Sequence, residues 1–99
     1  MPATTNFSPG SLISRQGRDE MTGSQVKSLA KDMRANGYDA TKPIDAANVD
    51  GKMIIIDGHH RAAAASKAGL KDVPVNVHKV SREQGDTLMR QAAEARTGN

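Results

Sequence analysis

Residues 54–65 have the sequence Ile54-Ile55-Ile56-Asp57-Gly58-His59-His60-Arg61-Ala62-Ala63-Ala64-Ala65. A β-branched run, a glycine among polar residues and an alanine-rich run predict a strand, a sharp turn and a helix. Gly58 lets the chain turn and lets a ligand approach the backbone. The first turn of a helix presents free N–H groups and the positive end of the helix dipole, and Arg61 adds a charge there. The stretch therefore predicts a phosphate-binding turn at Gly58–Arg61.

The neighbouring polar side chains are candidates for chemistry at this turn. A histidine near pH 7 can donate a proton or hydrogen-bond a phosphoryl oxygen, which suits His59 or His60. Adjacent helical residues point about 100° apart, so we expect only one of the two to face the ligand. Asp57 has two interpretations that both stay open: it caps the helix, or it is catalytic or holds Mg²⁺. His78 on the following strand could join His59 and His60, and the interpretation we favour is a surface histidine.

The rest of the chain predicts strands and helices around this unit. The expected helices cover residues 24–36, 59–68 and 81–96, and the expected strands cover 43–49, 52–56 and 73–80. Asp50-Gly51 predicts a two-residue hairpin turn. The continuous apolar run over 52–56 predicts a central strand that is buried on both faces. Pro74 places the last strand near an edge of the sheet or marks its start, and residues 11–14 could form a short edge strand.

Residues 81–96 contain a signal for the start of this helix and a residue that weakens it. Ser81 and Gln84 have the spacing of a capping box. Gly85 is expected to weaken the helix by about 1 kcal/mol relative to alanine.

Composition excludes several classes of protein. The chain has 99 residues, a net charge of +3 and no cysteine. The absence of cysteine excludes disulfides, thiolate catalysis and cysteine-zinc sites. No apolar run reaches the ~18 residues that a membrane span needs, so we expect no membrane partner. The modest positive charge favours polyanionic partners weakly.

The order of these motifs over residues 18–80 resembles the ParB/sulfiredoxin superfamily, in particular the ParB-like nuclease domain. The motifs that carry the resemblance are Gln16-Gly17-Arg18, Val26 and Leu29, Asn36-Gly37, Pro43-Ile44, Asp50-Gly51, Gly58-His59-His60-Arg61, Ala68-Gly69 and Val73-Pro74-Val75. In that family the Gly-x-x-Arg helix start binds nucleotide phosphates. Sulfiredoxins carry a reactive cysteine where His59 stands, so repair of oxidised peroxiredoxins is excluded here.

The resemblance implies a compact α/β domain with a small mixed sheet and about three helices. We expect a single ParB/sulfiredoxin-like domain over 1–99. It consists of a polar lead-in over 1–17, the family-like core over 18–80 and a C-terminal helix over 81–99.

The form Asp57-Gly58-His59-His60-Arg61 resembles ParB-fold small-molecule kinases and ParB-like domains at the C-terminal ends of bacterial polymorphic toxins. It implies a toxin effector that acts on nucleic acid or nucleotides, ATP or CTP, as a nuclease or nucleotide hydrolase. Such an effector acts in the bacterial cytoplasm, delivered by a secretion system as part of a larger protein, and has a cognate immunity protein. Two alternatives stay open: a small-molecule phosphotransferase, and a non-catalytic nucleotide-binding module.

With this resemblance, the charged segment 15–20 gains expected roles beside the Gly58–Arg61 turn. Arg18 is expected to be a second phosphate clamp. The carboxylates that could hold Mg²⁺ or act as a base are Asp19, Glu20 and Asp57. Because phosphoryl chemistry consists mostly of positioning and charge neutralisation, this small set could suffice.

Overall fold

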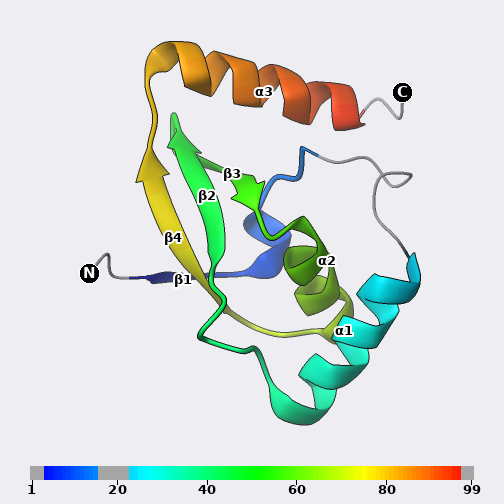
Figure 1. Cartoon of the computed structure of the whole chain (residues 1–99). Helices are drawn as coiled ribbons and strands as arrows, with labels where there is room; N and C mark the ends of the chain where they lie inside the picture. The colour runs from blue at the N-terminus through cyan, green and yellow to red at the C-terminus, as the bar shows by residue number, and fades with distance from the viewer. Residues whose placement is uncertain (1–3, 16–22, 97–99) are drawn as a thin grey trace.

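A computed structural model describes residues 4–15 and 23–96 of the chain. These residues form a four-stranded sheet in the order β1-β4-β2-β3, with α1 and α2 against one face and α3 across one end (Figure 1). The elements are β1 (Thr5–Phe7), the short 3₁₀ helix η1 (Pro9–Ser11), α1 (Gly23–Asn36), β2 (Ile44–Val49), β3 (Lys52–Asp57), α2 (His59–Ala68), β4 (Val73–Lys79) and α3 (Arg82–Arg96). The predicted α/β class is confirmed.

The sheet is mixed because β2 and β4 are parallel, while β1 pairs antiparallel with β4 and β3 pairs antiparallel with β2. Its central strands, β2 and β4, carry the largest fully buried side chains together with Ile54 of β3. The buried residues between the sheet and the helices α1 and α2 are Ala30, Met33, Ile44, Ala46, Ile55, Ala62, Ala64, Ala65, Val73 and Val75. Small alanines on α2 let this helix approach the sheet closely, which places its first residue next to the start of β2.

The hairpin between β2 and β3 confirms the predicted two-residue turn. Asp50 and Gly51 both have positive φ angles, 52° and 84°, as a type I′ turn requires. The prediction of a central strand over 52–56 is wrong, because β3 lies at the edge of the sheet. Ile54 and Ile55 are nevertheless both buried. α3 contacts β3, Ile55 belongs to the core together with residues of α1 and α2, and Ile13 bridges to Ile54 along the outer edge.

The N-terminal part of the described chain also differs from expectation. A strand forms at Thr5–Phe7, and residues 11–14 contribute only the isolated bridge of Ile13. β1 covers the outer side of β4, so Pro74 does not lie on an edge strand. The alternative interpretation, that Pro74 marks the beginning of a strand, fits its place as the second residue of β4.

The predicted capping box of α3 is confirmed. The backbone N–H of Gln84 donates to Ser81 Oγ, and the backbone N–H of Ser81 donates to Gln84 Oε1, both at 3.2 Å. Gly85, expected only to weaken the helix, has a packing role. It is buried, and a Cβ atom at this position would lie 3.2 Å from Val49 Cγ1. Gly85 thus lets α3 approach β2 closely.

We therefore expect Gly85→Ala to leave stability unchanged or lower it, although alanine favours a helix by about 1 kcal/mol. The gain in helix propensity is offset by the contact with the stiff Val49 side chain. Chemical denaturation of the single variant and of the Gly85→Ala/Val49→Ala pair measures the coupling. A single variant stabilised by the full propensity difference would show that α3 does not depend on this close approach.

None of the described helices combines the length and the apolar character needed to cross a bilayer.

Candidate phosphate-binding site

The turn between β3 and α2 has the backbone geometry of an anion site. Gly58 follows the last residue of β3 with φ 98° and ψ 26°, and α2 begins at His59 as predicted. The first helical bond runs from Ala62 N–H to Gly58 O at 2.9 Å. The N–H groups of the residues before Ala62 have no carbonyl within the helix to bind. Together with the helix dipole, they favour a negative charge at this point.

Asp57 does not cap this helix, so one of its two interpretations is wrong. The N-cap residue is Gly58, which has no side chain to make a capping hydrogen bond. The Asp57 side chain is exposed at the end of β3. The helix start is therefore not capped by its own aspartate, and its first residues, Gly58 and His59, are buried.

Arg61 folds back over the glycine of the turn. A Cβ atom at Gly58 would lie 3.1 Å from Arg61 Nη2 and 3.3 Å from Ile44 Cγ1, so only glycine leaves room there. Arg61 Nη2 donates to Pro43 O across a long 3.5 Å. Arg61 Nε is buried and has no hydrogen-bond partner among the described residues. The guanidinium is thus held beside the helix start with donor capacity to spare.

Tyr38, which follows the end of α1, lies beside Arg61. Its hydroxyl donates to Lys42 O at 2.7 Å. Partial burial raises the pKa of the Tyr38 hydroxyl, while hydrogen bonding and the positive charge of Arg61 act in the opposite direction. From the sequence, Tyr38 gave no sign of belonging to the site. Its place depends on the loop that returns from α1 to β2, and only the tertiary fold brings it to Arg61.

The two histidines occupy different environments, as their spacing predicts. His59 is only 8% exposed, and its Nε2 accepts a 3.4 Å hydrogen bond from the backbone N–H of Arg15. His59 also lines a small crevice between η1 and α2. His60 Nε2 is buried and has no partner among the described residues. A buried nitrogen of this kind is a place where a ligand or a water molecule can bind.

A polar cluster lies at the beginning of β2. Asp45 Oδ1 accepts from Asn76 Nδ2 at 3.3 Å and contacts His78 Nε2 at 2.9 Å. The parallel register of β2 and β4 pairs Asp45 with Asn76, and the antiparallel register of β2 and β3 pairs it with Asp57. The His78 side chain is 48% exposed, which confirms its predicted place at the surface. Asp45 is not predictable from the sequence because its partners are distant in the chain.

The described residues contain no group of three or more His, Cys, Asp or Glu side chains arranged to hold a metal ion. The Mg²⁺ interpretation of Asp57 stays a prediction. Its proposed helpers Asp19 and Glu20, and the second clamp Arg18, lie outside the described residues.

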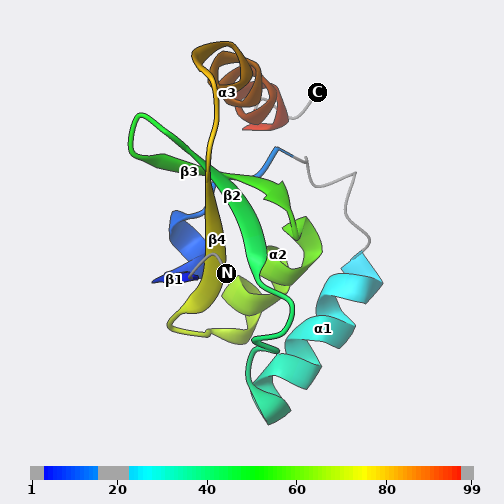
Figure 2. The same ribbon diagram turned by 60° about the vertical axis from the view of Figure 1, so that its left-hand side comes forward.

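Helices α1 and α2 pack side by side and begin at the same end of the molecule, as both Figure 1 and Figure 2 show. The first residues of α1, Ser24, Gln25, Ser28 and Leu29, line a hollow of about 470 Å³.

Comparison with known families and structures identifies the class of this domain. The profile of the ParB N-terminal domain matches residues 5–92. The chain belongs to this family. It is 38% identical over 71 residues to the probable chromosome 2-partitioning protein ParB of Deinococcus radiodurans. The match covers 72% of this chain, which spans 24% of the length of that relative.

Solved structures share the fold. Sulfiredoxin from Arabidopsis thaliana superposes with a TM-score of 0.73 and 26% identity, covering 90% of this chain and 99% of that one. The C-terminally truncated chromosome-partitioning protein ParB of Caulobacter crescentus, complexed with CTP-γ-S, gives a TM-score of 0.67 at 24% identity, covering 92% and 51%. A free serine kinase in complex with AMP gives 0.63 at 22% identity, covering 77% and 31%. The predicted ParB/sulfiredoxin-like fold is confirmed.

Proposed function

We propose that this domain binds a nucleotide through its phosphates at the Gly58–Arg61 turn. The observation that carries the proposal is the start of α2, where Arg61 lies beside a helix N-terminus whose N-cap residue is a glycine. The chain enters α2 through the left-handed and buried Gly58, which has no side chain to cap the helix, and Arg61 is folded over this glycine. An arginine with unpaired donors and a row of free N–H groups is the chemistry that binds phosphate.

Within this site each side chain has a distinct role. Arg61 neutralises phosphate charge, and His60 donates a hydrogen bond or proton from its unpartnered Nε2. His59 is held by Arg15 on the other side of the turn and acts as a support. Support also comes from two proteins with this fold that were solved with nucleotides, ParB with CTP-γ-S and the serine kinase with AMP.

The proposal predicts that ATP and CTP raise the melting temperature, whereas adenosine and cytidine do not. At a ligand concentration 100 times Kd, linkage adds about 2.7 kcal/mol, which for a domain of this size corresponds to an increase of about 10 °C or more. Thermal unfolding followed by circular dichroism makes the comparison. His60→Ala is expected to reduce the increase, and His78→Ala, at the surface, to retain it. Equal stabilisation by the nucleosides would contradict phosphate recognition.

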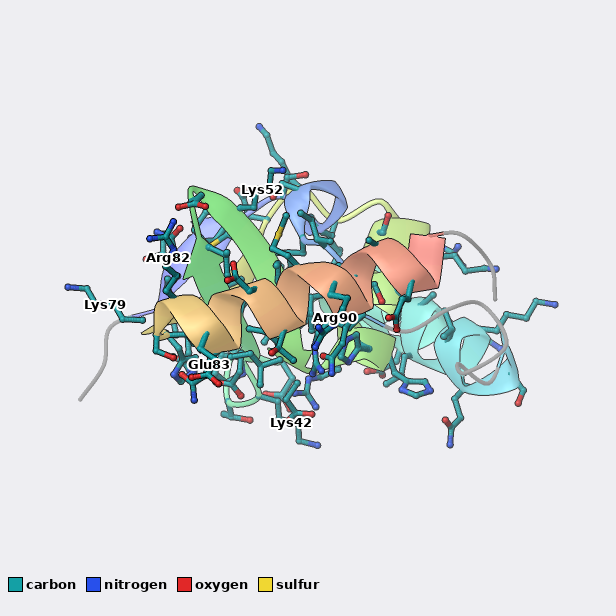
Figure 3. The ribbon with its side chains drawn as sticks, turned by 90° about the horizontal axis from the view of Figure 1, so that it is seen from above. Lys42, Lys52, Lys79, Arg82, Glu83 and Arg90 are labelled. Carbon is teal, nitrogen blue, oxygen red and sulfur yellow. The ribbon has the colours of Figure 1, made fainter. Side chains whose placement is uncertain are left out.

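The finer predictions, a toxin effector with nuclease or hydrolase activity and a small-molecule phosphotransferase, both build on this site. A nuclease needs an open basic groove. In Figure 3, Lys42, Lys52 and Lys79 extend outward on different sides of the molecule. Their dispersion favours a nucleotide over a nucleic acid as the ligand of the described residues. Binding of a labelled oligonucleotide as a function of salt tests the nuclease prediction, because contacts with several phosphates give a steep salt dependence.

A further inference from the structure

A β-bulge immediately precedes the phosphate-binding turn. Along the β2–β3 pair, Ala46 lies opposite Ile55, and Asp45 lies opposite Asp57. Ile56 is therefore an extra residue without a cross-strand partner. A bulge of this kind bends a strand and directs the residues that follow it. Here it sets the direction in which the chain enters Gly58. Ile55 directs its backbone groups to the outer edge of β3, where its N–H donates to Ile13 O at 2.8 Å, and carbonyl groups on this edge need donors from outside the sheet.

The Arg15 side chain supplies those donors. Its Nε donates to Ile55 O at 2.7 Å and its Nη2 donates to Ile56 O at 2.6 Å. The two bonds come from one planar guanidinium, so they fix the spacing and the orientation of successive carbonyl groups. Nη1 donates to Gln91 Oε1 of α3 at 2.9 Å, which orients the guanidinium from the opposite side.

Arg15 also reaches the first residue of α2 through its backbone. Its N–H donates to His59 Nε2 at 3.4 Å. A ring nitrogen that accepts this bond carries no proton, so a neutral His59 holds its proton on Nδ1. One residue thus contacts the chain on both sides of Gly58, at Ile55–Ile56 before it and at His59 after it.

We propose that Arg15 is a positioning residue that holds the Gly58–Arg61 turn in its anion-binding geometry. The bulge determines where β3 ends, and the bond to His59 determines how α2 begins. Without Arg15, the carbonyl groups of Ile55 and Ile56 lose two charge-assisted donors, and the turn is free to rearrange. The effect on nucleotide affinity rests on the proposed function, whereas the effect on the turn itself does not.

The test compares the ¹⁵N-labelled full chain with its Arg15→Met variant in the absence of nucleotide. We expect the amide resonances of 57–61 to move and the ¹⁵N pattern of the His59 ring to lose its single tautomer. Arg34→Ala is the matched control, since Arg34 also donates to a backbone carbonyl, Lys67 O at 3.2 Å. That bond lies at the other end of α2, so the control is expected to leave the turn unchanged.

Titration of the same samples with ATP and CTP gives the second readout. Arg15→Met is expected to weaken binding at least about tenfold, because small displacements of binding groups have large effects. Arg15→Lys keeps the charge but cannot donate in two parallel directions, so it is expected to restore little of the loss. If Arg15→Met does not fold, Arg15→Lys is measured in its place by the same two readouts.

The outcomes separate the proposals. Unchanged resonances at 57–61 would overturn the positioning role, and a lower affinity with an unchanged turn would instead mean that Arg15 contacts the nucleotide directly. A perturbed turn in a protein whose wild type binds neither ATP nor CTP would leave the positioning role intact and overturn the proposed function.

Discussion

Replacing Gly58 by alanine is expected to produce the largest loss of stability in the site. At φ 98° an L-residue is strained, which costs about 1–2 kcal/mol. The new Cβ would also lie 3.1 Å from Arg61 Nη2 and 3.3 Å from Ile44 Cγ1. Overpacking of this kind costs a further 1–3 kcal/mol, roughly. Displacing Arg61 should weaken ATP and CTP binding at the same time. Denaturant unfolding and nucleotide titration of one sample measure both effects.

Gly69→Ala is the matched control for this variant. Gly69 ends the same helix with φ 76°, and no atom lies within 4 Å of its Cβ position. It therefore reports the backbone strain without the clash. If both variants lose the same free energy of unfolding and both retain nucleotide affinity, the close approach of Arg61 to Gly58 is unimportant, and the geometry assigned to the site is wrong.

Arg61→Lys is expected to weaken nucleotide binding at least about tenfold, a loss of about 1.4 kcal/mol. Lysine keeps the positive charge but lacks the planar, two-pronged geometry that suits phosphate. The unfolding midpoint should change much less. The 3.5 Å contact with Pro43 O is long, and Arg61 Nε has no partner to lose among the described residues. Isothermal titration and urea unfolding of the same preparation separate the two effects.

A structural role for Arg61 predicts the opposite result. If its contacts with Tyr38 and Pro43 mainly hold the loop before β2, Arg61→Lys would lower the unfolding midpoint clearly while the folded protein binds ATP with unchanged affinity. Tyr38→Phe is a useful companion, because it removes the hydroxyl beside Arg61 but leaves the helix start intact.

The parts of this fold that the sequence predicts well are those determined locally. The helix over His59–Ala68 has a glycine on each side, in a left-handed conformation at both ends. The Asp50-Gly51 turn and the Ser81/Gln84 capping box likewise need only their own neighbours. The strand, turn and helix around Gly58 are such a local feature.

The features that the sequence does not predict depend on contacts between distant segments. β1 is three residues long and exists by pairing with β4. The sequence does not show that β3 is an edge strand, because Ile54 and Ile55 are as fully buried as the residues of a central strand. Glycine has a low helix propensity, so the sequence predicts only that Gly85 weakens α3. Its packing role depends on the close contact with Val49, which only the tertiary fold provides.

The candidate site likewise contains residues that the sequence brings together locally and residues that only the tertiary fold brings together. Gly58 and Arg61 stand three residues apart, so helical geometry alone brings them together. Arg15 is 40 residues from Ile55, and Asp45 is 33 residues from His78. Such pairs follow from the register of the sheet, which a pattern of residues within one segment does not specify.

The most direct test of phosphate binding at the start of α2 is a ¹H–¹⁵N chemical-shift titration of the full chain with ATP. The largest and saturable shifts are expected at Gly58, His59, His60 and Arg61, with pyrophosphate moving the same amides and adenosine leaving them in place. Saturable binding of ATP whose shifts fall elsewhere on the molecule, or no binding at millimolar concentration, would contradict the assignment of this turn as the nucleotide site.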